Sequence, residues 1–206
     1  MVVEAVAEPA RRPRAWPFAL AVLGGTALGI GAALWAIEAG ARPTAYQGWE
    51  ASTLAGSPDA DALTRARVAR SGLLALDRSQ AIYFNRTTDS AGRPLDEGCR
   101  YRVSGGPLPA RWWSVTVYAA DHYLPRNDGA ALSFDATEVV PDAAGRWQAL
   151  VGPAPQPGMA FASTQGAGDF ALTLRLYNPD AAAQRDFAGI ALPVVERLDC
   201  GGERPA

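Results

Sequence analysis

The chain has 206 residues, a formal net charge of −2 and 19 basic side chains, all of them arginine. This length accommodates one domain and a membrane anchor. The small negative charge argues against a nucleic-acid partner, because binding to phosphates needs a basic surface. The absence of lysine excludes Schiff-base catalysis, pyridoxal attachment and a P-loop.

The first predicted element is a transmembrane helix over residues 16–37, after an N-terminal segment at residues 1–15. No residue from Ala15 to Ile37 is charged. At about 1.5 Å per residue, this stretch crosses the roughly 30 Å hydrocarbon core of a bilayer. The alternative is a secretory signal cleaved near residues 39–41, although this apolar run is longer than the usual length of roughly 7–15 residues.

Charged residues around this helix predict its orientation. Arg11, Arg12 and Arg14 precede the helix, whereas only Glu38 and Arg42 follow it closely. Basic residues near a membrane span stay in the cytoplasm. We therefore expect a cytoplasmic N-terminus and an exported domain.

Small residues recur at every fourth position of the predicted helix, at Ala21, Gly25, Gly29 and Ala33. Such a stripe lets a second helix approach closely. It predicts contact with a partner transmembrane helix or with a second copy of the chain. The alternative is the glycine and alanine content that is usual in membrane helices.

The rest of the chain predicts three further parts: a linker at residues 38–58, a globular domain at residues 59–200 and a tail at residues 201–206. The domain begins with a short helix near residues 59–71. Its expected apolar face consists of Ala62, Leu63, Ala66 and Ala69.

Beyond this helix the hydrophobic pattern has a period of two, which is typical of strands. Trp113, Val115 and Val117 face one way, whereas Trp112 and its alternate neighbours face the other. Turn clusters such as 89–92 and 142–145 separate the strands. The pattern predicts a mainly β domain, an antiparallel sandwich or jelly roll. Strands are expected at residues 80–86, 99–103, 112–118, 131–134, 147–151, 170–177 and 194–198.

The two cysteines, Cys99 and Cys200, predict a disulfide bond, because export places them in an oxidising compartment. A bridge closing a loop of this length stabilises a fold by about 4–5 kcal/mol in a chain-entropy model. The alternative is a pair of unbonded thiols.

Few catalytic chemistries remain open to this sequence. His122 is the sole histidine, which argues against a histidine-rich metal site, and no G-x-S-x-G elbow is present. The stretch 166–171 matches a dinucleotide motif by letter but opens a strand instead of a helix, so we expect no cofactor. The residues that could line a cleft are Arg111, Trp112, Asp121, His122 and Asn127. The alternatives are that Trp112 packs against the helix and that His122 is a loop residue without a catalytic role.

Several segments resemble a bacterial family catalogued as domain of unknown function 1214. These segments are 93–95, 99–101, 110–118, 121–124, 166–170 and 174–179. The resemblance implies a β-sandwich and an envelope protein, and it implies no established activity. The chain departs from the family pattern at residues 125–128 and 159–164, so any pocket built from those loops is altered here.

These observations favour a protein of the bacterial inner membrane whose C-terminal domain lies in the periplasm. We expect a non-catalytic binding module or an accessory subunit of a membrane complex, because no catalytic set is apparent. The alternative is a periplasmic enzyme that acts on a glycan, a lipid or a small organic molecule.

Overall fold

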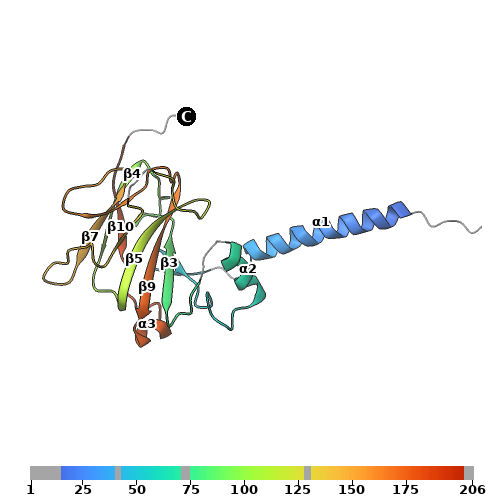
Figure 1. Cartoon of the computed structure of the whole chain (residues 1–206), viewed down its shortest axis with the longest axis horizontal. Helices are drawn as coiled ribbons and strands as arrows, with labels where there is room; N and C mark the ends of the chain where they lie inside the picture. The colour runs from blue at the N-terminus through green and yellow to red at the C-terminus, as the bar shows by residue number, and fades with distance from the viewer. Residues whose placement is uncertain (1–14, 40–42, 71–74, 128–130, 202–206) are drawn as a thin grey trace, which may run out of the picture. The chain divides into compact units, whose positions relative to one another are not determined.

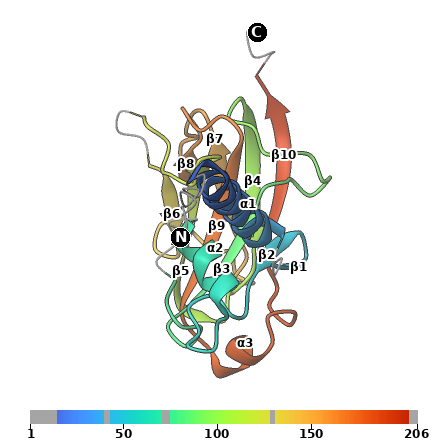
Figure 2. The same ribbon diagram turned by 90° about the vertical axis from the view of Figure 1, so that its right-hand side faces the viewer.

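The computed structural model describes residues 15–39, 43–70, 75–127 and 131–201. The chain forms two units: Met1–Gly40, which contains helix α1, and Ala41–Ala206, which contains the other elements (Figures 1 and 2). Helix α1 runs over Ala15–Ala39, and its segment Ala15–Ile37 is long and apolar enough to cross a membrane. The helix expected at residues 16–37 is therefore confirmed, and it could anchor the protein in a membrane.

The small-residue stripe lies on this helix, where a side chain added at Gly25 or Gly29 would meet nothing within 4 Å. Four residues advance an α-helix by about 400°, so the stripe winds slowly around its surface. The partner helix stays a prediction. The arginines at positions 11, 12 and 14 lie outside the described residues.

The second unit is a two-layer β-sandwich, which confirms the predicted fold class. One sheet has the order β1-β2-β3-β9-β5-β6 and the other β10-β4-β7-β8. All neighbouring strands are antiparallel except β7 and β8, which pair in parallel. The first sheet consists of β1 (Thr44–Tyr46), β2 (Trp49–Ala51), β3 (Ala81–Arg86), β9 (Phe170–Pro179), β5 (Ala110–Ala119) and β6 (Ser133–Asp135). The second consists of β10 (Val194–Cys200), β4 (Cys99–Gly105), β7 (Trp147–Gly152) and β8 (Ala160–Ser163).

The hydrophobic core lies between the two sheets. Trp113, Val115 and Val117 of β5 are buried, as the period-two pattern predicts. The ring of Trp113 stacks on that of Trp147 from β7, with centroids 4.4 Å apart. These rings join the two sheets across the core.

The expected linker at residues 38–58 is shorter than predicted, because β1 and β2 form a hairpin within it. The turn residues Gln47 and Gly48 have φ of 52° and 83°, the left-handed geometry that tight hairpins need. Trp49 is fully buried, and its Nε1 donates to the carbonyl of Pro193 at 2.7 Å. Each strand has three residues, too few for a period of two to be visible in the sequence.

The predicted short helix is present as α2 (Ala62–Arg70), but its inward face differs from the expected one. Leu63 is 41% exposed, whereas Thr64 is buried. The backbone N–H of Thr64 donates to Oδ1 of Asp61 at 2.9 Å, which caps the helix. A third helix, α3 (Ala181–Arg185), was not predicted.

Cys99 and Cys200 form the predicted disulfide, between residues 101 positions apart. They also face each other in the antiparallel register of β4 and β10. The bond thus fixes the last strand of the domain to the edge of its sheet. The N–H of Gly201 donates to the carbonyl of Gly98 at 3.0 Å, and residues 202–206 lie outside the described part.

Candidate functional site

The five residues predicted to line a cleft do not come together. Arg111 and Trp112 stand at the start of β5, whereas Asp121 and His122 follow its other end. A ten-residue strand spans about 30 Å, which is too far for side chains at its two ends to share a small ligand. The expected cleft is therefore wrong as a single site.

Each of these residues has a local role or an exposed position. The rings of Trp112 and Tyr177 pack with centroids 5.0 Å apart. Oδ1 of Asp121 accepts the N–H of Tyr123 at 3.0 Å, within its own turn. His122 is exposed at a φ of 68°. None of these three residues lines either of the two hollows described below.

Asn127 likewise lies outside both hollows, and its Nδ2 donates to the carbonyl of Gln165 at 2.9 Å. Arg111 is exposed. In the described residues, no three histidine, cysteine or acidic side chains gather as metal ligands would.

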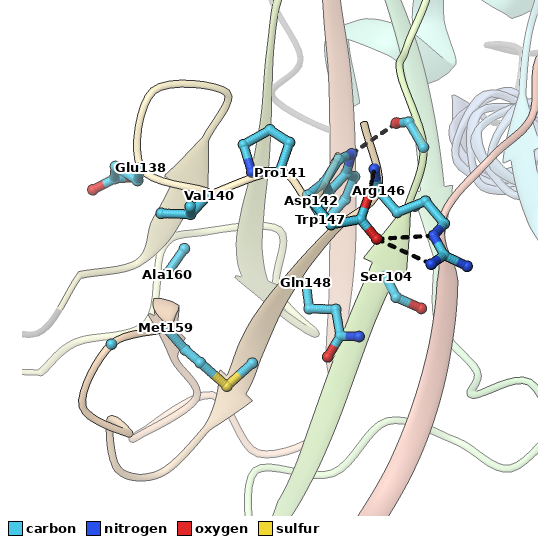
Figure 3. Close-up of a pocket in the computed structure, with 13 residues that line it drawn as sticks. Ser104, Glu138, Val140, Pro141, Asp142, Arg146, Trp147, Gln148, Met159 and Ala160 are labelled. Carbon is cyan, nitrogen blue, oxygen red and sulfur yellow. Dashed lines mark hydrogen bonds and ion pairs between the residues drawn. The ribbon is translucent and has the colours of Figure 1, made fainter. Parts of the chain in front are cut away.

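A groove with a volume of about 840 Å³ lies at the end of the four-stranded sheet (Figure 3). Its floor is formed by the end of β4 and the start of β7, and its walls by residues 138–142 and 158–160. Val140 is 83% exposed beside it. We call this hollow the main groove. Its size is typical of sites for small organic ligands.

Two glycines shape the floor of the main groove. A Cβ at Gly105 would lie 2.8 Å from Cζ2 of Trp147, so only glycine lets this indole pack here. Nε1 of Trp147 donates to the carbonyl of Gly106 at 2.8 Å. A Cβ at Gly106 would meet nothing within 4 Å. The backbone is thus accessible along the floor.

The three charged side chains that line the main groove are engaged locally. Oε2 of Glu138 accepts the N–H of Asp135 at 3.0 Å. Oδ2 of Asp142 accepts Nε of Arg146 at 3.0 Å, and Oδ1 accepts backbone N–H groups of its own turn. The hydrogen bond from the backbone N–H of Arg146 is the main reason that the pKa of Asp142 lies below its usual value. Each of these side chains thus has a hydrogen-bond partner within its own loop.

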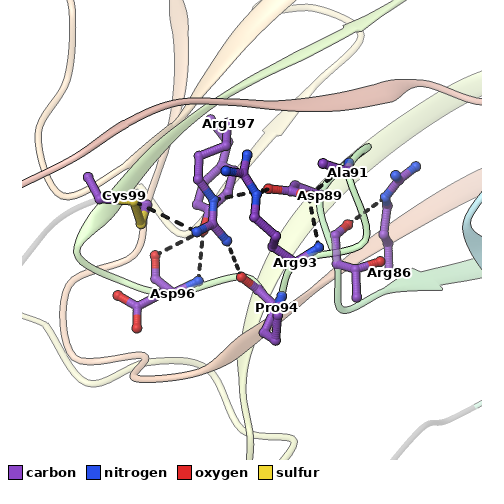
Figure 4. Close-up of polar contacts among 11 residues, drawn as sticks. Arg86, Asp89, Ala91, Arg93, Pro94, Asp96, Cys99 and Arg197 are labelled. Atoms are coloured by element: carbon purple, nitrogen blue, oxygen red, sulfur yellow. Dashed lines mark hydrogen bonds and ion pairs between the residues drawn. A yellow bond between two sulfur atoms is a disulfide. The ribbon is translucent and has the colours of Figure 1, made fainter.

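The second polar site is built on the turn that begins at Asp89 (Figure 4). Oδ1 of Asp89 accepts the backbone N–H groups of Ala91 and Arg93, at 2.9 and 3.0 Å. Oδ2 accepts Nε of Arg93 at 2.8 Å. The Asp89 side chain is completely buried. The turn thus encloses a carboxylate whose two oxygens are both in use.

Arg197 from β10 connects this turn to the rest of the domain. Its Nε lies 3.0 Å from Oδ2 of Asp89, an ion pair without the alignment of a hydrogen bond. Its guanidinium donates to the carbonyl of Pro94 and stands 5.4 Å from the ring centroid of Tyr101. Burial alone would raise the pKa of Asp89. Hydrogen bonds from Arg93 and Ala91, with the charge of Arg93, hold it below its usual value instead.

Arg86 lies beside this turn and is only 5% exposed. Its Nε donates to the carbonyl of Thr88 at 2.7 Å and its Nη1 to that of Gln47 at 3.1 Å. Burial lowers the pKa of Arg86, and the charge of Asp89 opposes this effect. Arg86 thereby ties the β1–β2 hairpin turn to β3. A hollow with a volume of about 320 Å³ lies next to it.

Sequence reasoning missed both hollows, because each one is lined by distant segments. One signal was present: the pattern Asp-x-Ala-Gly-Arg occurs at residues 89–93 and again at residues 142–146. Each copy borders a different hollow. Met159 and Ala160, which lie where the chain departs from the family pattern, line the main groove.

Comparison with known families confirms the resemblance drawn from the sequence. Residues 80–181 match the model of a family described as "Protein of unknown function (DUF1214)". This range contains strands β3 to β9. A search of curated proteins finds no match.

Two solved structures match parts of this chain. The VPA0106 protein from Vibrio parahaemolyticus is 21% identical, with a TM-score of 0.54 over 68% of this chain and 36% of its own. A putative uncharacterized protein from Burkholderia cenocepacia is 18% identical, with a TM-score of 0.42 over 73% of this chain and 46% of its own. The chain thus spans less than half the length of either protein. The first likeness supports the fold alone.

Proposed function

On the premise of this family resemblance, we propose that the protein is a non-catalytic binding module of the bacterial envelope. In this proposal α1 anchors it in the inner membrane, with the N-terminus in the cytoplasm and the domain in the periplasm. The main groove binds a small uncharged organic ligand or a short glycan segment. The observation that carries the proposal is the groove itself, with its glycine floor and its locally engaged charges.

The way the domain is connected to α1 supports a role close to a membrane. Residues 40–43 alone separate the end of α1 from the start of β1. The β1–β2 hairpin is fixed to the domain, because the side chain of Gln47 donates to the carbonyl of Ile190 at 2.8 Å and Trp49 donates to Pro193. A ligand that binds the domain is therefore retained near the bilayer.

The disulfide and the flanking arginines support export of the domain. A structural disulfide persists in oxidising compartments such as the periplasm. Fusion of alkaline phosphatase and, separately, of green fluorescent protein to the C-terminus tests this topology. We expect the phosphatase fusion to be active and the green fluorescent protein fusion to show no fluorescence. The reverse result would place the domain in the cytoplasm and contradict the proposal.

Ligand binding is tested with a variant that fills the main groove. A side chain at Gly106 enters open space and needs no left-handed backbone, so Gly106→Leu should fold normally. Ala143→Leu is the matched control, because it adds the same side chain at an exposed position outside the lining.

The measurement is native mass spectrometry of the full chain released from membranes in mild detergent. We expect a bound small molecule on the natural chain and on the Ala143→Leu variant, and none on Gly106→Leu. Equal occupancy in all three proteins, or none in any, would contradict a binding role for the groove.

The small-residue stripe supports a second contact, between α1 and a partner helix or a second copy of the chain. Replacing Gly25 and Gly29 by leucine blocks close approach of another helix. Crosslinking in native membranes should then lose its dimer or hetero-complex band. A band of unchanged intensity would show that the stripe is not the contact surface.

A further inference from the structure

The smaller hollow lies between the β1–β2 turn and the Asp89 turn, and we call it the hairpin pocket. It has a volume of about 320 Å³. Its lining includes Gln47, Gly48, Arg86, Thr88 and Ser90. It shares no lining residue with the main groove.

Arg86 gives the hairpin pocket a buried positive charge. The acceptors of its Nε and Nη1 are neutral backbone carbonyls. In the described part of the chain, no hydrogen bond is made by its Nη2. Figure 4 shows the terminal nitrogens of Arg86 directed away from Asp89 and Arg93. A buried guanidinium without a directly bonded carboxylate is costly, and an anion bound to it would offset that cost.

The only acid in the lining does not present its carboxylate to the hairpin pocket. The Asp89 side chain is fully buried, and Arg93, Arg197 and backbone N–H groups take up its oxygens. The side chains that remain available are hydrogen-bond donors, namely the hydroxyls of Thr88 and Ser90. The pocket therefore offers donors and positive charge.

Glycine at position 48 keeps this guanidinium accessible. Its φ is 83°, and a Cβ there would stand 3.0 Å from Nη2 of Arg86. Any side chain would therefore crowd the face of the guanidinium. The ring of Trp49 lies 5.8 Å from Cζ of Arg86 and fixes its position further. The arginine is held in place before any ligand arrives.

We propose that the hairpin pocket binds an oxyanion of the phosphate class, through Nη2 of Arg86 and the hydroxyls of Thr88 and Ser90. Guanidinium groups bind phosphate oxygens with charge-assisted hydrogen bonds, and the oxyanion accepts from both hydroxyls as well. The phosphate belongs either to a free small molecule or to a phospholipid headgroup. This site is independent of the main groove and of its ligand.

The test uses the full chain with its disulfide intact, in a neutral detergent. Inorganic phosphate is titrated against sodium chloride at constant ionic strength, and the melting temperature is recorded. A ligand that binds only the folded state raises the melting temperature in a saturable way. We expect this rise with phosphate and not with chloride.

Ser90→Asp places a carboxylate at the mouth of the hairpin pocket, where it would pair with Arg86 and repel phosphate. Ser90 is exposed, so the fold should persist. We expect phosphate affinity to fall by about tenfold or more, as the loss of a charge-assisted contact implies. Ser90→Ala should weaken it by a smaller factor.

Ser133→Asp is the matched control, because it adds the same charge to an exposed position on β6, at the far edge of the sheet from β2 and β3. It should bind phosphate as the natural chain does. The proposal is overturned if phosphate causes no saturable rise in the natural chain, or if Ser90→Asp and Ser133→Asp weaken binding equally.

The two phosphate sources are distinguished in proteoliposomes. One set contains the phosphate-free lipid digalactosyldiacylglycerol alone, and the other contains equal parts of this lipid and phosphatidylglycerol. If the source is a headgroup, the anionic lipid competes with inorganic phosphate for the pocket. The rise in melting temperature on adding phosphate then disappears in the second set only. If the source is a free molecule, the effect persists in both sets.

Discussion

The two Asp-x-Ala-Gly-Arg turns have the same local structure and different surroundings. In both, Oδ1 of the aspartate accepts two backbone N–H groups, and Oδ2 accepts Nε of the arginine four residues later. The glycines have φ of 79° and 74°. Yet the Asp89 side chain is completely buried, whereas that of Asp142 is 45% exposed.

The difference originates outside the turns. Arg197 reaches Asp89 from a strand more than a hundred residues away. The arginine within the turn at Asp142, Arg146, is 75% exposed. In one place the five-residue pattern is joined to strand β10 by the ion pair between Asp89 and Arg197, which we call the Asp89 clamp. In the other place it forms the rim of the main groove. The local sequence determines the conformation of each turn, and contacts with distant segments determine what the turn does in the fold.

The largest expected effect is the loss of the disulfide that places β10 beside β4. Replacing Cys99 and Cys200 by alanine should lower the free energy of unfolding by about 4–5 kcal/mol in the chain-entropy model. Because β10 carries Arg197, the clamp at Asp89 should weaken too. The measurement is urea unfolding of the full chain in detergent, followed by tryptophan fluorescence.

Removing the disulfide also tests how the Asp89 turn and the Asp142 turn differ. In the cysteine-free protein, removing Asp89 should cost less than it does in the oxidised protein, because the two changes share Arg197. Removing Asp142 should cost the same in both. An unchanged cost at Asp89 would show that the clamp does not depend on the bridge.

The next largest effect is expected from Asp89→Ala. It leaves the buried Nε of Arg197 without its ion pair and the N–H groups of the turn without their acceptor, so we expect a loss of about 3–5 kcal/mol. Asp142→Ala is the control, since it removes the same turn contacts from an exposed site and should cost much less. Equal losses in urea unfolding would break the distinction between the two turns.

A smaller effect is expected from acid. The pKa of Asp89 is below its usual value in the folded protein, so its stabilisation is present above about pH 4 and is lost as the pH falls through the folded pKa. Asp89→Ala should therefore lose less stability than the natural chain on acidification. The pKa of Asp142 is lowered too, so Asp142→Ala should also lose some acid sensitivity, but less than Asp89→Ala, because solvent screens the contacts of its 45% exposed side chain. Parallel pH profiles for all three proteins, measured by thermal unfolding, would refute this assignment.

Sequence patterns were sufficient where the physical signal is local. The uncharged stretch 15–37 gave the apolar helix, and alternation gave the long strands β5 and β9, including the inward direction of Trp113. The pair Cys99 and Cys200 followed from their number and from the inferred export. The residues that determine the helix and the strands are neighbours in the sequence. The disulfide could be predicted because the chain has only two cysteines.

Sequence patterns failed where the deciding contact is distant. The strands β1, β2 and β8 have three or four residues and show no usable period. The pairing of Asp89 with Arg197 requires the register of β10 on β4. The cleft expected at Arg111 and His122 failed because an extended strand separates residues that are near in sequence.

A double-mutant cycle tests the central claim, that one turn clamps strands and the other does not. Unfolding free energies of Asp89→Ala, Arg197→Ala and their combination give the coupling between the two side chains, and Asp142 with Arg146 gives the matched cycle. We predict a coupling of about 0.5–3 kcal/mol between Asp89 and Arg197, and none measurable between Asp142 and Arg146. Additive effects at Asp89 and Arg197, or equal couplings in the two cycles, would contradict the account.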